Sequence, residues 1–133
     1  MNENQLFYAA QKAFIEKKGE ILILHDPLIG LDFPGGRIQV GETNLITALQ
    51  REVREETTLE IQVGNPFTTW IFKHPTTIEQ SFLTGYRCTY VSGEVSLSDE
   101  HDNFHWVNKD NYTQFKDSTD YYKALEHYFQ LFA

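Results

Sequence analysis

The chain has 133 residues and a formal net charge of −8, from 11 Lys and Arg residues against 19 Asp and Glu residues. This length allows one hydrophobic core and argues against two, so we expect a single domain over residues 1–133. The acidic charge argues against stable binding of nucleic acid, which relies on Lys and Arg to neutralise phosphates. A small phosphate-bearing substrate remains compatible with this charge if bound cations supply the missing positive charge.

The cysteine content and the hydropathy limit the kinds of site and the cellular location that the sequence allows. Cys88 is the single cysteine, which excludes an internal disulfide and a multi-cysteine zinc site. The sequence has no apolar run long enough to span a membrane and no N-terminal pattern typical of a signal peptide. We therefore expect a cytoplasmic protein without a membrane partner.

The first third of the chain predicts strands. Residues 5–16 and 21–24 are rich in aromatic and aliphatic side chains and flank Lys17-Lys18-Gly19, which predicts two strands joined by a tight turn. The second of these strands is apolar throughout and should be buried on both faces. A short extended piece is expected at 31–33, and Pro34-Gly35-Gly36 predicts a break in the backbone.

Residues 43–57 carry the clearest helical pattern. Ile46, Leu49 and Val53 recur at spacings of three and four, and Thr43 or Asn44 can cap the start. The segments that follow are rich in Thr, Val, Ile, Phe and Tyr, which predicts strands at 60–63, 67–73, 78–91 and 94–97 and a short strand ending at Trp106-Val107.

A second helix is expected from about Asp120. Tyr121, Leu125, Tyr128 and Phe132 fall on one stripe of that helix. Strands, one helix, more strands and a closing helix predict an α/β fold with a mixed sheet and helices on its faces.

The chemistry is concentrated in the first helix. Glu52, Glu55 and Glu56 project from one sector, since Glu55 and Glu56 lie roughly 60° and 40° to either side of Glu52 at helical spacing. Carboxylates this close repel one another, and a divalent cation such as Mg²⁺, which takes oxygen ligands, would reverse that cost. The alternative is a solvated charged helix in which Arg51 pairs with Glu55.

The residues before this helix favour the metal-binding alternative. Phe33-Pro34-Gly35-Gly36 lets the backbone approach an ion or a phosphate closely, and Gly41-Glu42 sets a turn ahead of the helix. Residues 36–59 resemble the Nudix box, G-x5-E-x7-R-E-U-x-E-E-x-G-U with U bulky and apolar. The matching residues are Gly36, Glu42, Arg51, Glu52, Val53, Glu55, Glu56 and Leu59.

Two positions depart from the box. Eight residues rather than seven separate Glu42 from Arg51, so the loop or the first helical turn must absorb one insertion. Thr58 stands where the box has a glycine that ends the helix in a left-handed conformation. Because Thr is poor at positive φ, we expect this helix to end in a different way. Neither change removes a carboxylate.

The resemblance implies the Nudix α/β/α sandwich and hydrolysis of a diphosphate bond in a nucleoside diphosphate linked to a group X. We place nucleoside triphosphates ahead of nucleotide sugars and ADP-ribose. The resemblance implies that Glu52, Glu55 and Glu56 hold Mg²⁺, or Mn²⁺ in its place, together with the Gly36 backbone carbonyl. It also implies that Arg51 orients the glutamates by ion pairing.

The resemblance leaves the general base open between Glu55 and Glu100. Glu100 precedes His101 and the segment ending in Trp106-Val107, and similar acid–His segments in Nudix chains supply a base or a further metal ligand. The alternative for Glu100 is an acidic surface loop. Arg37 follows the glycine pair and is a candidate for contact with a substrate phosphate.

The sequence leaves the roles of several aromatic residues and two rival functions open. Trp70, Phe72 and Tyr86 can stack on a nucleobase, although aromatic residues in strands more often belong to the core. The rival functions are a catalytically silent Nudix-fold module that senses a nucleotide, and an interaction domain whose charged helix binds nothing. A monomer and a homodimer are both compatible with the sequence.

Overall fold

The computed structural model describes residues 2–132. The strands are β1 (Tyr8–Lys17), β2 (Glu20–Asp26), β3 (Gly30–Asp32), β4 (Gly35–Arg37), β5 (Glu60–Lys73), β6 (Gln80–Ser92) and β7 (Asn103–Val107). The α-helices are α1 (Leu45–Thr57) and α2 (Asp120–Phe132), and a short 3-10 helix, η1, covers Tyr112–Phe115. Among these residues no helix has the length and apolar character needed to cross a membrane.

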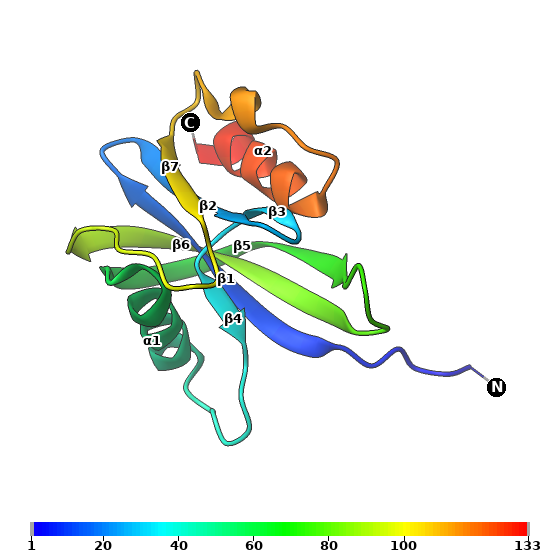
Figure 1. The fold of residues 1–133 in the computed structure, drawn as a ribbon. Helices are drawn as coiled ribbons and strands as arrows, with labels where there is room; N and C mark the ends of the chain where they lie inside the picture. The colour runs from blue at the N-terminus through cyan, green and yellow to red at the C-terminus, as the bar shows by residue number, and fades with distance from the viewer. Residues whose placement is uncertain (1, 133) are drawn as a thin grey trace.

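The strands form one mixed sheet with α1 and α2 on opposite sides (Figure 1). The order is β3-β2-β1-β6-β5, with β4 also paired to β1 and β7 to β2. β1 and β6 run parallel, and the other paired strands run antiparallel. The predicted α/β/α sandwich with a mixed sheet is confirmed.

Alternation along β1 separates two cores. Phe14 packs toward α2 with Leu125, whereas Ala13 and Ile15 pack toward α1 with Leu49. Such alternation is the period of two that strands impose on side chains. The predicted apolar stripe of α2 is confirmed, with Tyr121, Leu125 and Tyr128 buried and Phe132 half-buried. The predicted burial of 21–24 on both faces is also confirmed.

The glycine pair lies where β1 and β2 diverge. β1 pairs with β2 only at Glu16 and Lys17, and its other half, Ala10 to Lys12, pairs with β4. The predicted backbone break at Pro34-Gly35-Gly36 is therefore wrong for Gly35 and Gly36, which belong to the short strand β4. Gly35 has φ 137°, and a Cβ there would lie 2.0 Å from the Gln11 carbonyl oxygen, so only glycine fits.

Two strand predictions are corrected. Residues 60–63 and 67–73 belong to one strand, β5, in which register shifts around Pro66 replace the predicted interruption. Residues 94–97 form no strand. Their backbone packs on the end of α1, where Ser96 N–H donates to the Thr57 carbonyl at 3.0 Å and Ser98 N–H donates to the Glu56 carbonyl at 3.1 Å.

Helix α1 begins as expected and ends differently from the prediction. The Asn44 side chain caps the start by accepting from Thr47 N–H at 3.0 Å. Ile46, expected on the apolar stripe, is 53% exposed because it precedes the part of the helix that packs on the sheet. Thr58 adopts the left-handed conformation, φ 65°, that we expected it to avoid. Its hydroxyl donates to the Glu94 carbonyl, which helps to hold this conformation.

Candidate active site

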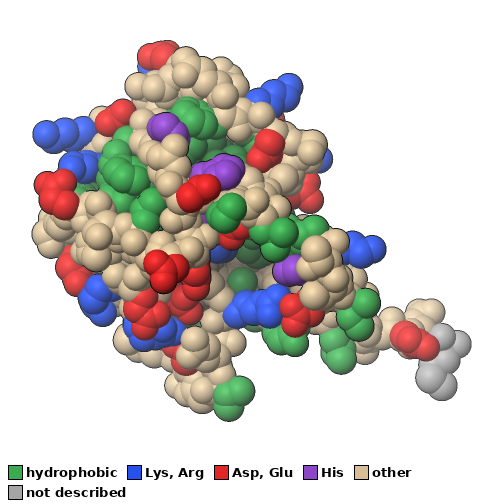
Figure 2. Space-filling view, viewed as in Figure 1, with side chains coloured by type: hydrophobic (Ala, Val, Ile, Leu, Met, Phe, Trp, Pro, Cys, Tyr) green, Lys and Arg blue, Asp and Glu red, His purple; other side chains and the backbone are tan. Residues whose placement is uncertain are grey.

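A pocket of about 380 Å³ opens where α1, β4 and the loop before β7 meet. Lys12, Glu52, Glu56 and Glu100 are among its lining residues, together with the Gly35-Gly36 backbone. Figure 2 shows Asp and Glu side chains gathered on the face that contains α1. A larger hollow of about 840 Å³ lies between the β1–β2 turn and the end of α2, but it contains none of the predicted site residues.

The three glutamates of α1 lie in different environments. Glu56 is buried, and its Oε2 accepts from Gly35 N–H at 2.8 Å. The Glu52 side chain is 15% exposed and the Glu55 side chain is 59% exposed. Glu52 and Glu56 line the pocket, but Glu55 does not. Two of the three glutamates expected in one sector of the helix thus face the pocket, whereas Glu55 pairs with Arg51.

Arg51 connects these acids to the loop before the helix. Its guanidinium lies 3.0 Å from Glu42, 3.2 Å from Glu52 and 3.0 Å from Glu55. The Arg51–Glu55 pair of the solvated-helix alternative is present, but Arg51 also reaches inward to Glu52. The extra loop residue has not separated Arg51 from Glu42. A backbone N–H of Gln39 and the Arg51 guanidinium hold the pKa of Glu42 below its ordinary value.

A buried ionic network lies beneath the pocket, and the sequence did not predict it. Lys12 Nζ lies 3.1 Å from Asp32 Oδ1 and donates to the Gly35 carbonyl at 3.4 Å. Asp32 Oδ2 lies 2.9 Å from His101 Nε2. Burial alone would raise the pKa of Asp32, but Lys12 and His101 outweigh it and lower that pKa. The only sequence signal was a charged residue within each of two apolar strands.

Two carboxyl groups of the pocket, those of Glu52 and Glu56, have raised pKa values. Burial raises the pKa of Glu56 to about 8 despite the nearby Lys12 ammonium, and the neighbouring Asp32 and Glu100 carboxylates add to the rise. Burial also raises the pKa of Glu52, against the opposing effect of Arg51. A cation bound here would reverse these shifts, because it stabilises the charged carboxylates.

The side chains present fit a hard divalent cation. Glu56, Glu100 and His101 each offer a ligand atom, and these atoms lie within 4.8 Å of one another. The buried His101 Nδ1 has no hydrogen-bond partner among residues 2–132. Glu52 lies against Gly36 so closely that a Cβ there would be 2.5 Å from Glu52 Oε2. Carboxylate oxygens suit Mg²⁺ and Mn²⁺, and an imidazole nitrogen suits Mn²⁺ better than Mg²⁺.

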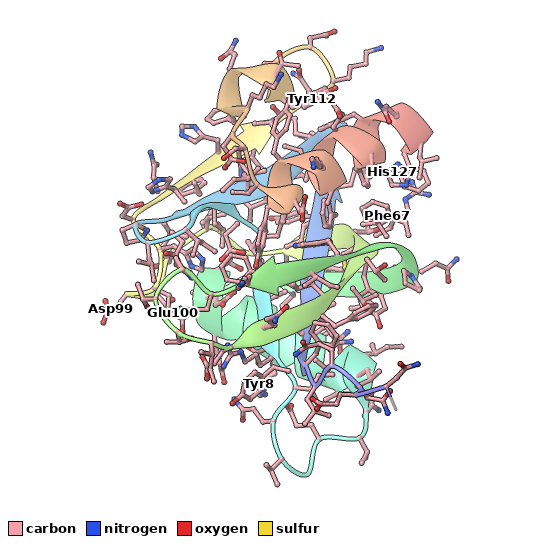
Figure 3. The ribbon with its side chains drawn as sticks, turned by 90° about the vertical axis from the view of Figure 1, so that its right-hand side faces the viewer. Tyr8, Phe67, Asp99, Glu100, Tyr112 and His127 are labelled. Carbon is pink, nitrogen blue, oxygen red and sulfur yellow. The ribbon has the colours of Figure 1, made fainter. Side chains whose placement is uncertain are left out.

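The loop before β7 brings Glu100 into this group. The bond from Ser98 N–H to the Glu56 carbonyl anchors the loop to the end of α1. Figure 3 shows Glu100 at the tip of this loop, on the side of the molecule away from Phe67 and His127. Glu100 is exposed, yet it lines the pocket. It therefore combines access to water with proximity to Glu56.

Arg37 and Phe72 also line the pocket, and the Arg37 side chain is 41% exposed. The Arg37 guanidinium lies 3.2 Å from Glu79 and 4.1 Å above the Tyr8 ring centroid. These contacts hold Arg37 at the mouth of the pocket. Of the three aromatic residues considered for stacking, only Phe72 lines the pocket, because Trp70 is in the α2-side core and Tyr86 packs against the α1-side core.

A family model of the NUDIX domain matches residues 9–128. The chain belongs to the Nudix family. This membership confirms the resemblance and supports a pyrophosphohydrolase, an enzyme that cleaves diphosphate bonds. A search among curated proteins found no significant match.

Solved Nudix structures share the fold. A MutT protein from Methanosarcina mazei Go1 is 25% identical with a TM-score of 0.79, over 98% of this chain and 97% of that chain. A NUDIX-family hydrolase from Clostridium perfringens is 19% identical with a TM-score of 0.76, and the match covers 97% of this chain and 100% of that chain. An ADP-ribose pyrophosphatase from Streptococcus suis 89-1591 is 20% identical with a TM-score of 0.62, and the match covers 78% of this chain and 75% of that chain.

Proposed function

We propose that this Nudix domain hydrolyses a diphosphate bond in a nucleoside diphosphate linked to a group X, with Mg²⁺ as its cofactor. The observation that carries the proposal is the convergence of Glu56, Glu100 and His101 within 4.8 Å, with both glutamates lining the pocket. The pocket also holds Glu52 and two cationic side chains, Lys12 and Arg37. Few structural roles require such a concentration of opposite charges around a solvent-filled space.

The cation would be held by Glu52 and Glu56, with the Gly36 carbonyl and Glu55 as further ligands of the predicted set. Bound there, it would neutralise charge on the diphosphate oxygens and lower the pKa of a bound water. Glu56 is fixed for this role by its bond from Gly35 N–H. Arg51 is a positioning residue, since it contacts both Glu52 and Glu55.

The chemical step is attack of a water oxygen on one phosphorus of the diphosphate. The bond from that phosphorus to the bridging oxygen breaks, and the leaving phosphate keeps the electron pair. We assign Glu100 as the general base that accepts the proton of the water, since it lines the pocket and Glu55 does not. Arg37 at the mouth is placed to contact a phosphate oxygen once it leaves Glu79.

In our leading version the group X is a third phosphate, which makes nucleoside triphosphates the first candidates for the substrate. Phe72 lines the pocket and offers the ring for a nucleobase. Nucleotide sugars and ADP-ribose present the same diphosphate to the acids and differ only in the group beyond it. A panel of substrates therefore separates them.

The test is hydrolysis of nucleoside triphosphates, nucleotide sugars, ADP-ribose and dinucleoside polyphosphates, with and without Mg²⁺, with products identified by chromatography. Glu52→Gln is the site variant. Glu60→Gln is its matched control, because Glu60 pairs with Arg54 outside the pocket. Mg²⁺-dependent cleavage that Glu52→Gln loses and Glu60→Gln keeps supports the proposal. No turnover on any compound by folded protein would overturn it in favour of a nucleotide-sensing module.

A further inference from the structure

The inner end of the pocket holds a buried cation that the proposed reaction does not use. The Lys12 side chain is only 9% exposed, and its ammonium lies 3.1 Å from Asp32 Oδ1 and 3.4 Å from the Gly35 carbonyl oxygen. A carboxylate and a backbone carbonyl are oxygen ligands of the kind that divalent cations take in proteins. The ammonium thus occupies a position whose surroundings also suit a metal ion.

A second group of potential ligands surrounds the same carboxylate. Asp26, Asp32 and His101 each offer one atom, and these atoms lie within 4.8 Å of one another. We call this the inner group, and Glu56, Glu100 and His101 the outer group. The two groups share His101 and are therefore adjacent. The Lys12 ammonium is ion-paired to the inner group through Asp32.

The sheet holds Lys12 in this position. Its backbone pairs with Gly35 of β4 on one side and with Gly85 of β6 on the other. The side chain leaves the middle of a paired strand and ends among buried groups at the pocket, so the ammonium has little freedom to move away from Asp32. A divalent cation at the inner group would therefore face a fixed positive charge, and repulsion at such short range is strong in a protein interior.

We propose that the Lys12 ammonium is a built-in cation that takes the place of a divalent ion at the inner group and confines metal binding to the outer group. This inference rests on the proposed function, which places a cation at Glu56, the carboxylate that the outer group shares with the proposed metal ligands. It assigns to Lys12 a role in setting the number of cations in the site, beyond its contribution to stability.

The test is a titration with Mn²⁺, in which free Mn²⁺ is followed by electron paramagnetic resonance. Lys12→Met keeps much of the side-chain volume and removes the charge, and Lys12→Arg keeps the charge. Arg54→Met removes a cation from an exposed pair with Glu60 on the same side of the sheet as α1. We expect Lys12→Met to bind one more Mn²⁺ per chain than the parent, whereas Lys12→Arg and Arg54→Met bind the parent number.

The outcomes separate this inference from the proposed function. Identical isotherms for Lys12→Met and a metal-binding parent overturn the role of Lys12 and leave the proposed function standing. Binding by Lys12→Met alone supports the role of Lys12 and contradicts metal binding at the outer group. Absence of binding by both contradicts both proposals.

Lys12→Met leaves Asp32 without its partner, so its folding is followed separately. Thermal unfolding is measured for the parent and for Lys12→Met with and without Mn²⁺. A cation that binds only the folded state raises its stability by mass action. We expect Mn²⁺ to raise the melting temperature of Lys12→Met more than that of the parent. An equal rise, or a Lys12→Met chain that Mn²⁺ fails to fold while Lys12→Arg folds, overturns the inference.

Discussion

Two ionic networks flank the same pocket, and they differ in burial and in the way the chain assembles them. Arg51 gathers Glu42, Glu52 and Glu55 from one loop and one helix, with the Arg51 side chain 31% exposed. Asp32 joins Lys12 to His101, a residue 69 positions away in sequence, with side chains 9% exposed or less. Breaking a buried ion pair costs far more than breaking an exposed one. The two networks should therefore respond very differently to substitution.

The largest effect is expected at Asp32. Asp32→Asn leaves the Lys12 ammonium buried without a countercharge, which should lower the free energy of unfolding by about 3–5 kcal/mol. Urea denaturation followed by circular dichroism measures this loss. The double variant Asp32→Leu with Lys12→Met removes both charges and should lose less than the single variant. A single-variant loss of under about 1 kcal/mol would mean that Lys12 is not dependent on Asp32.

The second effect concerns Glu56, which lies between the two networks. Its folded-state pKa of about 8 lies above its ordinary value of 4.5, so the unfolded chain releases this proton first as pH rises. The cation-free protein should therefore lose stability between about pH 5 and pH 8, by on the order of 1 kcal/mol per pH unit. Denaturation in a chelator at several pH values measures this slope. Glu56→Gln should flatten it, and a variant with the parent's slope would refute the assignment.

A smaller effect is expected from the half-exposed network. Arg51→Met should lower the free energy of unfolding by about 1 kcal/mol or less, because solvent screens these pairs. The loss should shrink in concentrated NaCl, whereas the loss from Asp32→Asn should persist. Arg54→Met, at the exposed pair with Glu60, is the control for removing one arginine from α1. A salt-independent loss of several kcal/mol would place Arg51 with the buried network instead.

The smallest effect lies outside both networks, at the end of α1. Thr58 carries a left-handed backbone, which costs a residue with a Cβ about 1 kcal/mol that glycine avoids. Thr58→Gly should therefore be more stable than Thr58→Ala by about this amount, since both variants lose the hydroxyl bond to Glu94. Thermal unfolding compares them. Equal stabilities would show that the helix end relaxes out of this conformation.

The contrast between the networks also explains what the sequence could predict. Glu52, Glu56 and Arg51 lie within one helix, so their spacing places them together, and the Asn44 cap and the α2 stripe follow from equally local rules. Strand β4 has only three residues and pairs with the half of β1 that has diverged from β2. No local sequence pattern predicts that divergence, so the strand was not predicted. The segment 94–97 has strand-like residues, but it follows the end of α1 instead, where the Ser96 N–H donates to the Thr57 carbonyl.

Lys12, Asp32 and His101 come from three separate segments and meet only in the folded sheet. Each has an ordinary local explanation in sequence, and a charged residue in an apolar strand was the only indication. For Glu55 the helical spacing correctly predicted a position near Glu52 and Glu56. The ion pair with Arg51, which the spacing alone does not decide, sets the direction of its side chain. Spacing thus predicted which residues approach the site, and packing decided which of them line the pocket.

The most direct test of the proposed function is the Mg²⁺-dependent kcat/KM of the parent, Glu56→Gln and Glu60→Gln on the best substrate of the panel. Loss of partners that merely support metal ligands lowers activity by about 10–100-fold, so Glu56→Gln should lose about 100-fold or more. Glu60→Gln, whose carboxylate pairs with Arg54 outside the pocket, should stay near the parent value. Equal activity of the two folded variants would contradict a catalytic centre at Glu56.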